Sequence, residues 1–205
     1  MKPRQLSLIA GISYLIIFFA AIFANFFVIE AIKAEPLVMI STKGMLVRFG
    51  ILAFLITVVF DVVVAWALFE LYKEHALNTL STYFRLMHAI IMGVAIYLLP
   101  QTLSLTSVEG ILTQVNNFNT LWLIGLLFFG MHLILLGRIF QRPVFIAIFL
   151  ILAGTVYIID TTANFLMPNY QDYSNIFLTI VAIPSVIGEM SLAIWLIWKG
   201  LKSPL

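Results

Sequence analysis

Residues 45–72 read MLVRFGILAFLITVVFDVVVAWALFELY, and this stretch decides the fold. Its charged residues are Arg48, Asp61 and Glu70, and the rest is almost entirely apolar. A hydrocarbon core about 30 Å thick is crossed by roughly 20 apolar residues in a helix. The stretch therefore predicts a transmembrane helix that carries a carboxylate near its middle.

Five further stretches have the same character, and together they account for most of the 205 residues. The chain is 63% hydrophobic and 10% charged, whereas soluble domains are about 45–50% apolar and about 25% charged. This composition excludes a soluble enzyme and a nucleic-acid-binding protein. It predicts an all-α membrane protein, a six-transmembrane-helix bundle in the lipid bilayer that forms one domain over residues 1–205. The predicted spans are residues 6–32, 45–72, 83–103, 118–138, 144–165 and 175–198.

Lysine and arginine are unevenly distributed between the two ends of these spans, and such residues favour the cytoplasmic side. The first apolar run is longer than the 7–15 residues of a signal-peptide core, so it is interpreted as an uncleaved span. The bias predicts that both termini lie in the cytoplasm. The basic residues on or near the cytoplasmic side are Lys2, Arg4, Lys73, Arg85, Arg138, Arg142, Lys199 and Lys202, and those outside are Lys33, Lys43 and Arg48.

The connection between spans three and four has apolar residues at helical spacing over residues 105–115. This pattern suits a short helix lying in the outer interface. An irregular loop is an equally good interpretation.

Ionisable residues inside a span are costly and mark functional candidates. Depths estimated from a rise of about 1.5 Å per residue put Asp61 and Glu189 roughly 15–18 Å from the cytoplasmic ends of their helices, and His88 and His132 roughly 5–10 Å from them. These four residues predict a protonatable polar cavity in the inner half of the bundle. Arg85 lies close enough to a span end to reach water by snorkelling. It also lies one turn from His88 and could instead hydrogen-bond to the cytoplasmic loop or to a nearby carboxylate.

A second polar layer is predicted nearer the outer face. On span five, three of its residues are spaced i, i+3, i+7 and so share one helix face. An ion pair between Arg48 and Asp160 is expected there, either as a structural pair that fixes helix register or as a gate. The layer consists of Asn25, Arg48, Tyr157, Asp160 and Asn164.

Several kinds of chemistry fit the inner residues. Buried carboxylates and histidines often form proton relays, which favours a site that binds or translocates a small molecule or ion. His88 and His132 with a carboxylate could instead bind zinc or iron in an intramembrane metal-dependent hydrolase. The same two histidines could ligate a haem. A structural membrane protein without chemistry is the remaining alternative, whereas a retinal Schiff base is excluded because no lysine lies inside a span.

Glycines and polar residues also form local motifs, and these resemble a bacterial integral-membrane family known only as a domain of unknown function. The resemblance covers nearly the whole chain and implies a multi-spanning helical protein of the bacterial inner (plasma) membrane, with no implied reaction. In span four, Gly130 and Gly137 lie at heptad spacing, which lets helix backbones approach closely. The motifs are RFGI (48–51) leading to Asp61, GLLFFGMHLILLG (125–137), GTVYIID (154–160) and GEMSLAIWLIWKG (188–200).

Overall fold

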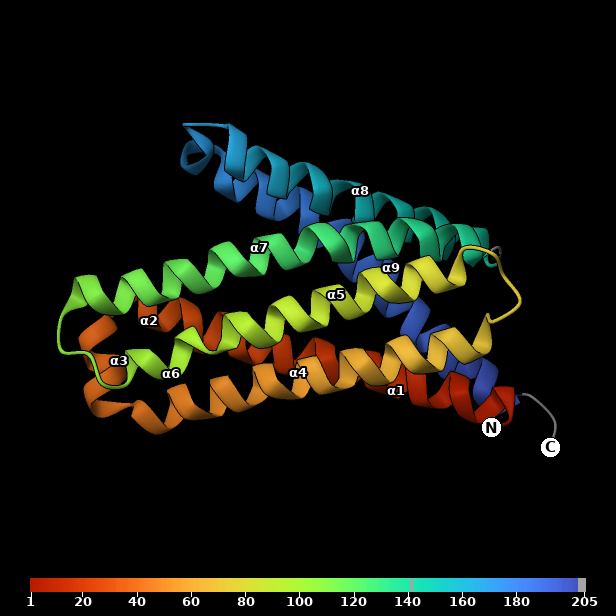
Figure 1. Cartoon of the computed structure of the whole chain (residues 1–205), viewed down its shortest axis with the longest axis horizontal. Helices are drawn as coiled ribbons and strands as arrows, with labels where there is room; N and C mark the ends of the chain where they lie inside the picture. Colours follow the sequence, from red (N-terminus) through yellow and green to blue (C-terminus); the bar gives the residue numbers. More distant parts are fainter. Residues whose placement is uncertain (141, 203–205) are drawn as a thin grey trace.

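The computed structural model describes residues 1–140 and 142–202, and within them the chain is helical nearly throughout (Figure 1). Most segments are α-helices, but η1 is a π-helix and η2 a short 3₁₀ helix. The elements are α1 (Pro3–Ile22), η1 (Phe23–Ile29), α2 (Glu30–Ala34), α3 (Pro36–Thr42), α4 (Gly44–Leu71), α5 (Asn78–Ile96), α6 (Leu98–Thr102), α7 (Val108–Ile139), α8 (Val144–Leu166), η2 (Tyr170–Tyr173) and α9 (Ser174–Lys202).

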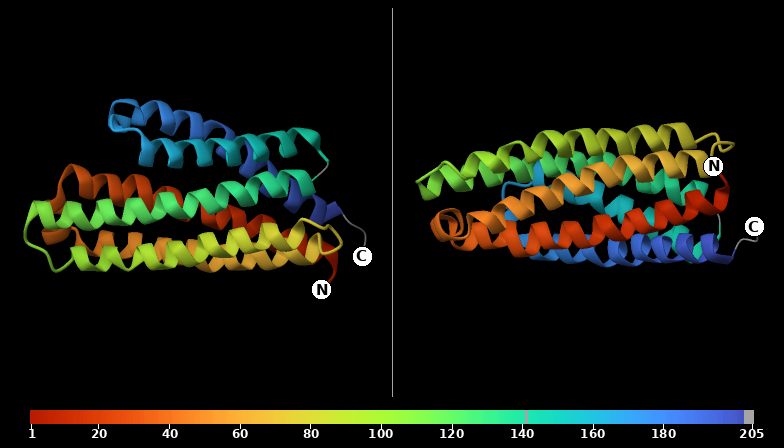
Figure 2. Two further views of the ribbon diagram at one scale, coloured as in Figure 1. Left: turned by 45° about the horizontal axis from the view of Figure 1, so that its top comes forward. Right: turned by 90° about the horizontal axis from the view of Figure 1, so that it is seen from below.

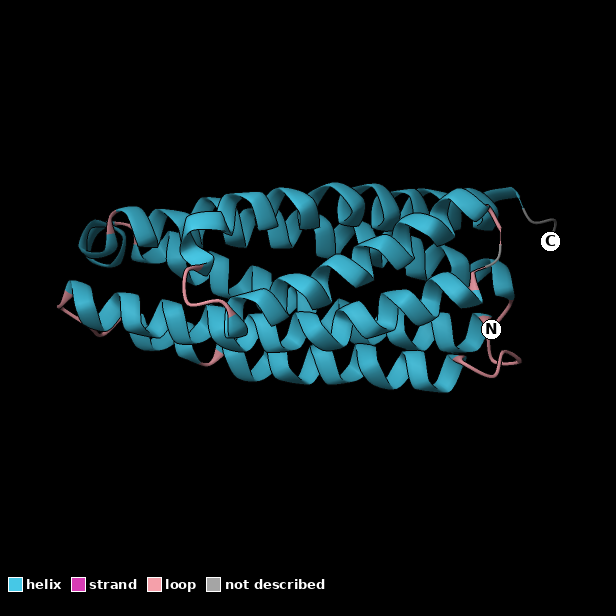
Figure 3. Ribbon diagram, turned by 90° about the horizontal axis from the view of Figure 1, so that it is seen from above, coloured by secondary structure: helices cyan, strands magenta, loops and turns pink. Residues whose placement is uncertain are grey.

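Six helical segments are long and apolar enough to cross a membrane, which confirms the predicted six-span all-α architecture. Figure 3 shows the helices running along a common direction with the loops gathered at the two ends. The N-terminus and the end of α9 lie at the same end of the bundle, called the inner end below (Figure 1). The six segments are Pro3–Ala34, Gly44–Leu71, Asn78–Thr102, Val108–Ile139, Val144–Leu166 and Tyr170–Lys202.

The predicted interfacial helix between spans three and four is wrong. Residues 108–115 of this pattern are the first turns of α7, a continuous helix of 32 residues, and residues 105–107 precede it. The Oγ atom of Ser107 accepts a hydrogen bond from the backbone N–H of Gly110 (3.2 Å) and caps this helix. Of the five apolar residues of the predicted interfacial face, Ile111 and Val115 are fully buried inside the bundle, whereas Val108 is 43% exposed. The helical period was therefore read correctly, but it extends span four instead of forming a separate element.

Two apolar cores are stacked along the bundle. The inner core includes Leu133 of α7 and Leu192 of α9, both fully buried. The outer core closes around Phe54 and Phe118, whose ring centroids lie 5.1 Å apart, and it includes Met39 of α3. The inner core can therefore surround polar residues, while the outer core packs the opposite end of the bundle with apolar side chains.

Helix α7 crosses α8 at glycines. A Cβ atom on Gly130 would lie 2.7 Å from the carbonyl oxygen of Gly154, and one on Gly137 would lie 2.8 Å from that of Ala147. The predicted role of Gly130 and Gly137 in close helix packing is thus confirmed. These contacts fix the position of α7, which carries His132.

Helix α9 changes its surroundings near Pro184. Its buried residues begin at Ser185 and continue to Gly200, whereas none of its residues from Ser174 to Pro184 is buried. Proline inside a helix removes one backbone hydrogen bond and favours a bend. The outer halves of α8 and α9 form an arm that stands apart from the other spans, and the inner half of α9 crosses beneath α8 to reach α1 (Figure 2).

Candidate functional site

The centre of the inner half of the bundle is the guanidinium of Arg85, whose residue is only 1% exposed. Its Nη2 donates to Oδ1 of Asp61 (2.6 Å), and its Nε lies 3.4 Å from the backbone carbonyl oxygen of the same residue. Its Nη1 donates to the Tyr14 hydroxyl (2.8 Å) and lies 3.2 Å from Nε2 of His132. The prediction that Arg85 snorkels to water is wrong, because α5 begins at Asn78 and directs this side chain into the bundle. The alternative, a hydrogen bond to a nearby carboxylate, is confirmed by Asp61.

His132 is held in one orientation by α5 as well as by Arg85. Its Nδ1 lies 3.0 Å from the carbonyl oxygen of Ser81 and 2.9 Å from the Ser81 hydroxyl. A carbonyl only accepts and a guanidinium only donates. The hydrogen-bonding partners therefore assign the proton to Nδ1 and the lone pair to Nε2, which accepts from Arg85.

His88 completes the contacts of the Asp61 carboxylate. Its Nε2 lies 3.7 Å from Oδ2 of Asp61, and its ring packs on Phe129 with centroids 4.8 Å apart. Its Nδ1 is buried without a well-formed hydrogen bond in the described residues. A Cβ atom on Gly125 would lie 3.3 Å from this nitrogen, so the glycine of α7 makes room for the imidazole.

Glu189 of α9 lies beside these residues without joining their hydrogen bonds. It is close enough to interact electrostatically with Arg85 and Asp61. Unlike them it is partly exposed. No hydrogen bond or ion pair to its carboxylate is found among residues 1–140 and 142–202. We call Tyr14, Asp61, Arg85, His88 and His132 the Arg85 cluster, and Glu189 is the additional carboxylate at its edge.

The structure therefore brings the four predicted inner residues together, although around an arginine and not around an open cavity. Two shallow, open pockets in the described part of the chain lie elsewhere on α9. One, of ≈ 370 Å³, is lined by Ala182, Ile183, Val186 and Ile187, just outward of Glu189.

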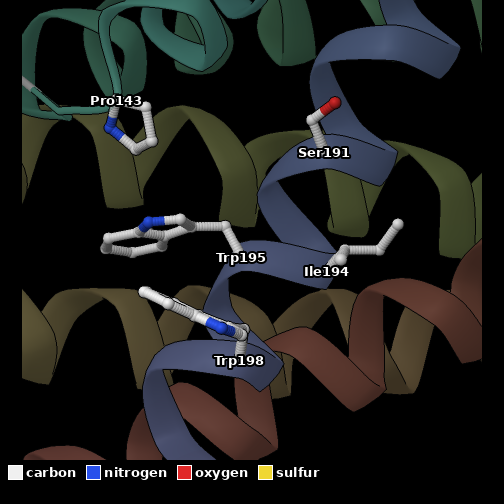
Figure 4. A pocket seen from close by; sticks show the side chains of 5 residues that line it. All are labelled: Pro143, Ser191, Ile194, Trp195 and Trp198. Carbon is white, nitrogen blue, oxygen red and sulfur yellow. The ribbon is translucent and has the colours of Figure 1, made fainter. Parts of the chain in front are cut away.

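The other pocket, of ≈ 460 Å³, lies near the inner end of α9 (Figure 4). The indoles of Trp195 and Trp198 extend from the helix on the side of Pro143. The ammonium groups of Lys199 and Lys202 lie 4.8 and 4.5 Å from the centroids of these two rings, respectively. Tryptophan beside lysine is typical of the membrane–water interface. We therefore assign this pocket to the membrane boundary.

The predicted outer layer does not assemble, and the Arg48–Asp160 ion pair is wrong. Arg48 is exposed and forms no ion pair in the described residues, whereas Oδ1 of Asp160 accepts from the Tyr170 hydroxyl (2.6 Å). The reason is that Arg48 lies on α4 and Asp160 on α8, and these two helices do not pack against each other. Asn164 also lies near the Tyr170 hydroxyl.

The two remaining residues of that layer lie apart from this pair. Asn25 donates through Nδ2 to the Ala21 carbonyl oxygen of its own helix (3.0 Å), within the region of the π-helix η1. The ring of Tyr157 packs on Phe129, with centroids 5.7 Å apart, and so belongs to the inner core. The predicted layer is thus distributed over four separate surroundings.

The donor set does not fit the predicted metal or haem alternatives. The guanidinium of Arg85 occupies the approach to Nε2 of His132, the atom that would otherwise bind a metal. The described residues contain no group of three or more potential metal ligands. The Phe129 ring contacts both imidazoles, so they do not face one another across a space that a haem could fill.

Comparison with known proteins now gives the family. A model described as "Domain of unknown function (DUF4386)" matches residues 9–200, which include Glu189 and the whole Arg85 cluster. The chain belongs to the DUF4386 family. This finding confirms the resemblance inferred from the motifs, and the DUF4386 domain takes in parts of all six spans.

One similar protein is an uncharacterized protein of Archaeoglobus fulgidus. It is 29% identical over 160 residues, which cover 75% of this chain and 85% of that protein. No solved structure matches the chain significantly.

Sequence reasoning missed three members of the site: Tyr14, Ser81 and the central role of Arg85. A signal for Arg85 was present, because it lies three residues before His88 and so on the same helix face. It also lies seven residues inside the helix that begins at Asn78, which is about two turns from the end. Tyr14 gave no comparable signal, since an isolated tyrosine in an apolar span is common at any depth.

Proposed function

We propose that this protein binds a small ligand beside the Arg85 cluster and translocates it, and that Glu189 exchanges a proton as it does so. The observation that carries the proposal is the pairing pattern: Arg85 is fully engaged with Asp61, Tyr14 and His132, while Glu189 has no direct partner in the described residues. An ion pair that merely fixes helix register would need Arg85 and Asp61 only.

The cost of keeping a carboxylate among the spans supports a functional role for Glu189. A carboxylate in the hydrocarbon region is expensive to keep unless it is paired, protonated or in contact with water or a ligand. Glu189 interacts with one guanidinium and one carboxylate at a distance, so the nearby charges largely offset each other. Such a residue is suited to gain and lose a proton as a ligand arrives and leaves.

We also infer that the protein lies in the inner (plasma) membrane of a prokaryotic cell with both termini in the cytoplasm. Helical spans are typical of plasma-membrane proteins, and the lysine and arginine bias supports the orientation. Because the chain lacks cysteine, Glu74→Cys and Asn169→Cys each give one reporter. In intact cells a membrane-impermeant maleimide is expected to label the cysteine at position 169 and not the one at 74. The reverse pattern would invert the assignment.

Carbodiimide labelling tests the role of Glu189. Dicyclohexylcarbodiimide dissolves in lipid and reacts with protonated carboxylic acids. We expect mass spectrometry of the protein in lipid nanodiscs to find the adduct at Glu189 and not at Asp61, because Asp61 is buried against a guanidinium. Glu189→Gln is expected to remove this adduct.

Glu70→Gln is the matched control, since Glu70 is exposed near the inner end of α4. This variant should leave the labelling of Glu189 unchanged. A wild-type protein without any adduct at Glu189 would contradict the proposed function.

A further inference from the structure

The arrangement of α9 indicates how a ligand reaches Glu189. One face of this helix carries a stripe at alternating intervals of four and three residues: Leu178, Ala182, Ser185, Glu189, Leu192 and Leu196. The inner part of the stripe is covered by the bundle, since Leu192 and Leu196 are fully buried. The outer part is uncovered, since Leu178 is 57% exposed and Ala182 is exposed as well. Ser185 is buried as well, so the covered part begins at Ser185, and Glu189, which is partly exposed, lies one turn inside it.

The uncovered part leads outward into the bilayer. It begins where the arm of α8 and α9 stands apart from the other spans (Figures 1 and 2). The ≈ 370 Å³ pocket lies in this region and is lined only by apolar side chains. Its residue Val186 lies three positions before Glu189, less than one helical turn away. A ligand on this path would pass along apolar surface as far as Val186, which is 46% exposed, and the partly exposed carboxylate of Glu189 lies within one turn of that residue.

The charges at the end of the path select the ligand. Two carboxylates, Asp61 and Glu189, lie near one guanidinium, and Asp61 already pairs with it directly. An ionised Glu189 thus leaves one negative charge without a direct partner in the described residues. A single positive charge on the ligand would balance it, and an ammonium also donates hydrogen bonds to a carboxylate.

On the basis of the proposed function, we propose that the ligand is an amphiphile with an alkyl tail and a primary ammonium head, which enters sideways from the half of the bilayer remote from the termini. The tail lies along Leu178 and Ala182, and the head pairs with Glu189. The proton and the ammonium compete for the same carboxylate, which couples binding to proton exchange.

Binding of a tail-labelled alkylammonium tests the ligand class. The probe carries a dansyl group at the end of its alkyl chain, and energy transfer from the tryptophans reports its binding to protein in nanodiscs. The matched alkanol, which differs only in its head, is the comparison. We expect wild-type protein to bind the alkylammonium at least about tenfold more tightly, the factor given by one ion pair of about 1.4 kcal/mol. Glu189→Gln should remove this preference, and Glu70→Gln should keep it.

A second pair of variants tests the route. Ala182→Trp fills the uncovered stripe and is expected to weaken binding of both probes. Ile180→Trp is its control, because Ile180 is 48% exposed on the opposite face of α9. If Ala182→Trp and Ile180→Trp weakened probe binding equally, the proposed route along the stripe would be wrong.

The outcomes also separate this inference from the function on which it rests. Equal binding of alkanol and alkylammonium by a protein whose Glu189 still reacts with carbodiimide would overturn the ligand class and leave the proposed function standing. Failure of both the preference and the carbodiimide reaction would overturn both.

Discussion

Arg85→Gln is expected to lower the free energy of unfolding by about 3–5 kcal/mol, which is typical when one partner of a buried ion pair is removed. The loss is large because Asp61 would keep its charge without the guanidinium that now lies 2.6 Å away, and because the Tyr14 hydroxyl and His132 lose a donor. Chemical denaturation of the purified protein in a single detergent, followed by circular dichroism, measures this change. Arg48→Gln is the control, since Arg48 is exposed, and it should change the value by less than about 0.5 kcal/mol.

The double variant Asp61→Asn with Arg85→Gln shows whether the stability lost in Arg85→Gln is due to Asp61 being left without its partner. Its loss of stability should be smaller than the sum of the losses in the two single variants, because residues in direct contact are not additive. Additive losses would contradict the ion pair as the basis of the cluster.

Gly130→Ala is expected to lower the free energy of unfolding by about 1–3 kcal/mol, the usual cost of overpacking. The added methyl group would lie 2.7 Å from the Gly154 carbonyl oxygen, so a helix backbone must shift. The shift would move α7 and with it the Nε2 atom of His132 that accepts from Arg85. The same denaturation experiment measures the change in the free energy of unfolding.

Gly93→Ala is the matched control for this substitution. Its Cβ atom would meet nothing closer than 4.0 Å, at Val58, and alanine is the better helix former by up to about 1 kcal/mol. This variant should therefore be neutral or slightly more stable. If both alanine variants behaved alike, close packing of α7 on α8 would not explain the role of Gly130.

The sequence was a good guide to the spans because lipid imposes one condition, a helix of about 20 apolar residues, on every crossing segment. At the ends of the spans, where the chain meets water, this condition no longer applies and the prediction became weaker. The apolar residues at 105–115 have a helical period, and the same period suits a helix on the interface or the outer end of a long span. Only the burial of Ile111 and Val115 in the outer core decides between them.

The candidate site was predicted in composition but not in arrangement. Asp61, His88 and His132 stood out because ionisable residues are rare in spans, and they do lie together. Depth along a helix gives no information on which helices are neighbours, and so Arg48 and Asp160 were paired although their helices, α4 and α8, do not pack against each other. Arg85 was placed at the boundary because a long side chain can reach water from there, whereas the positions of Tyr14 and His132 draw it inward.

The central claim is that Glu189 exchanges a proton while Asp61 remains paired with Arg85. The most direct measurement is the rate of carbodiimide labelling at both carboxylates in one sample of wild-type protein in nanodiscs, followed by mass spectrometry over a range of pH. The structure predicts labelling at Glu189 that slows as the pH rises, because only the protonated acid reacts, and no labelling of Asp61 at any pH at which the protein stays folded. Labelling of Asp61 as fast as that of Glu189, or no labelling of Glu189 at any pH, would contradict the claim.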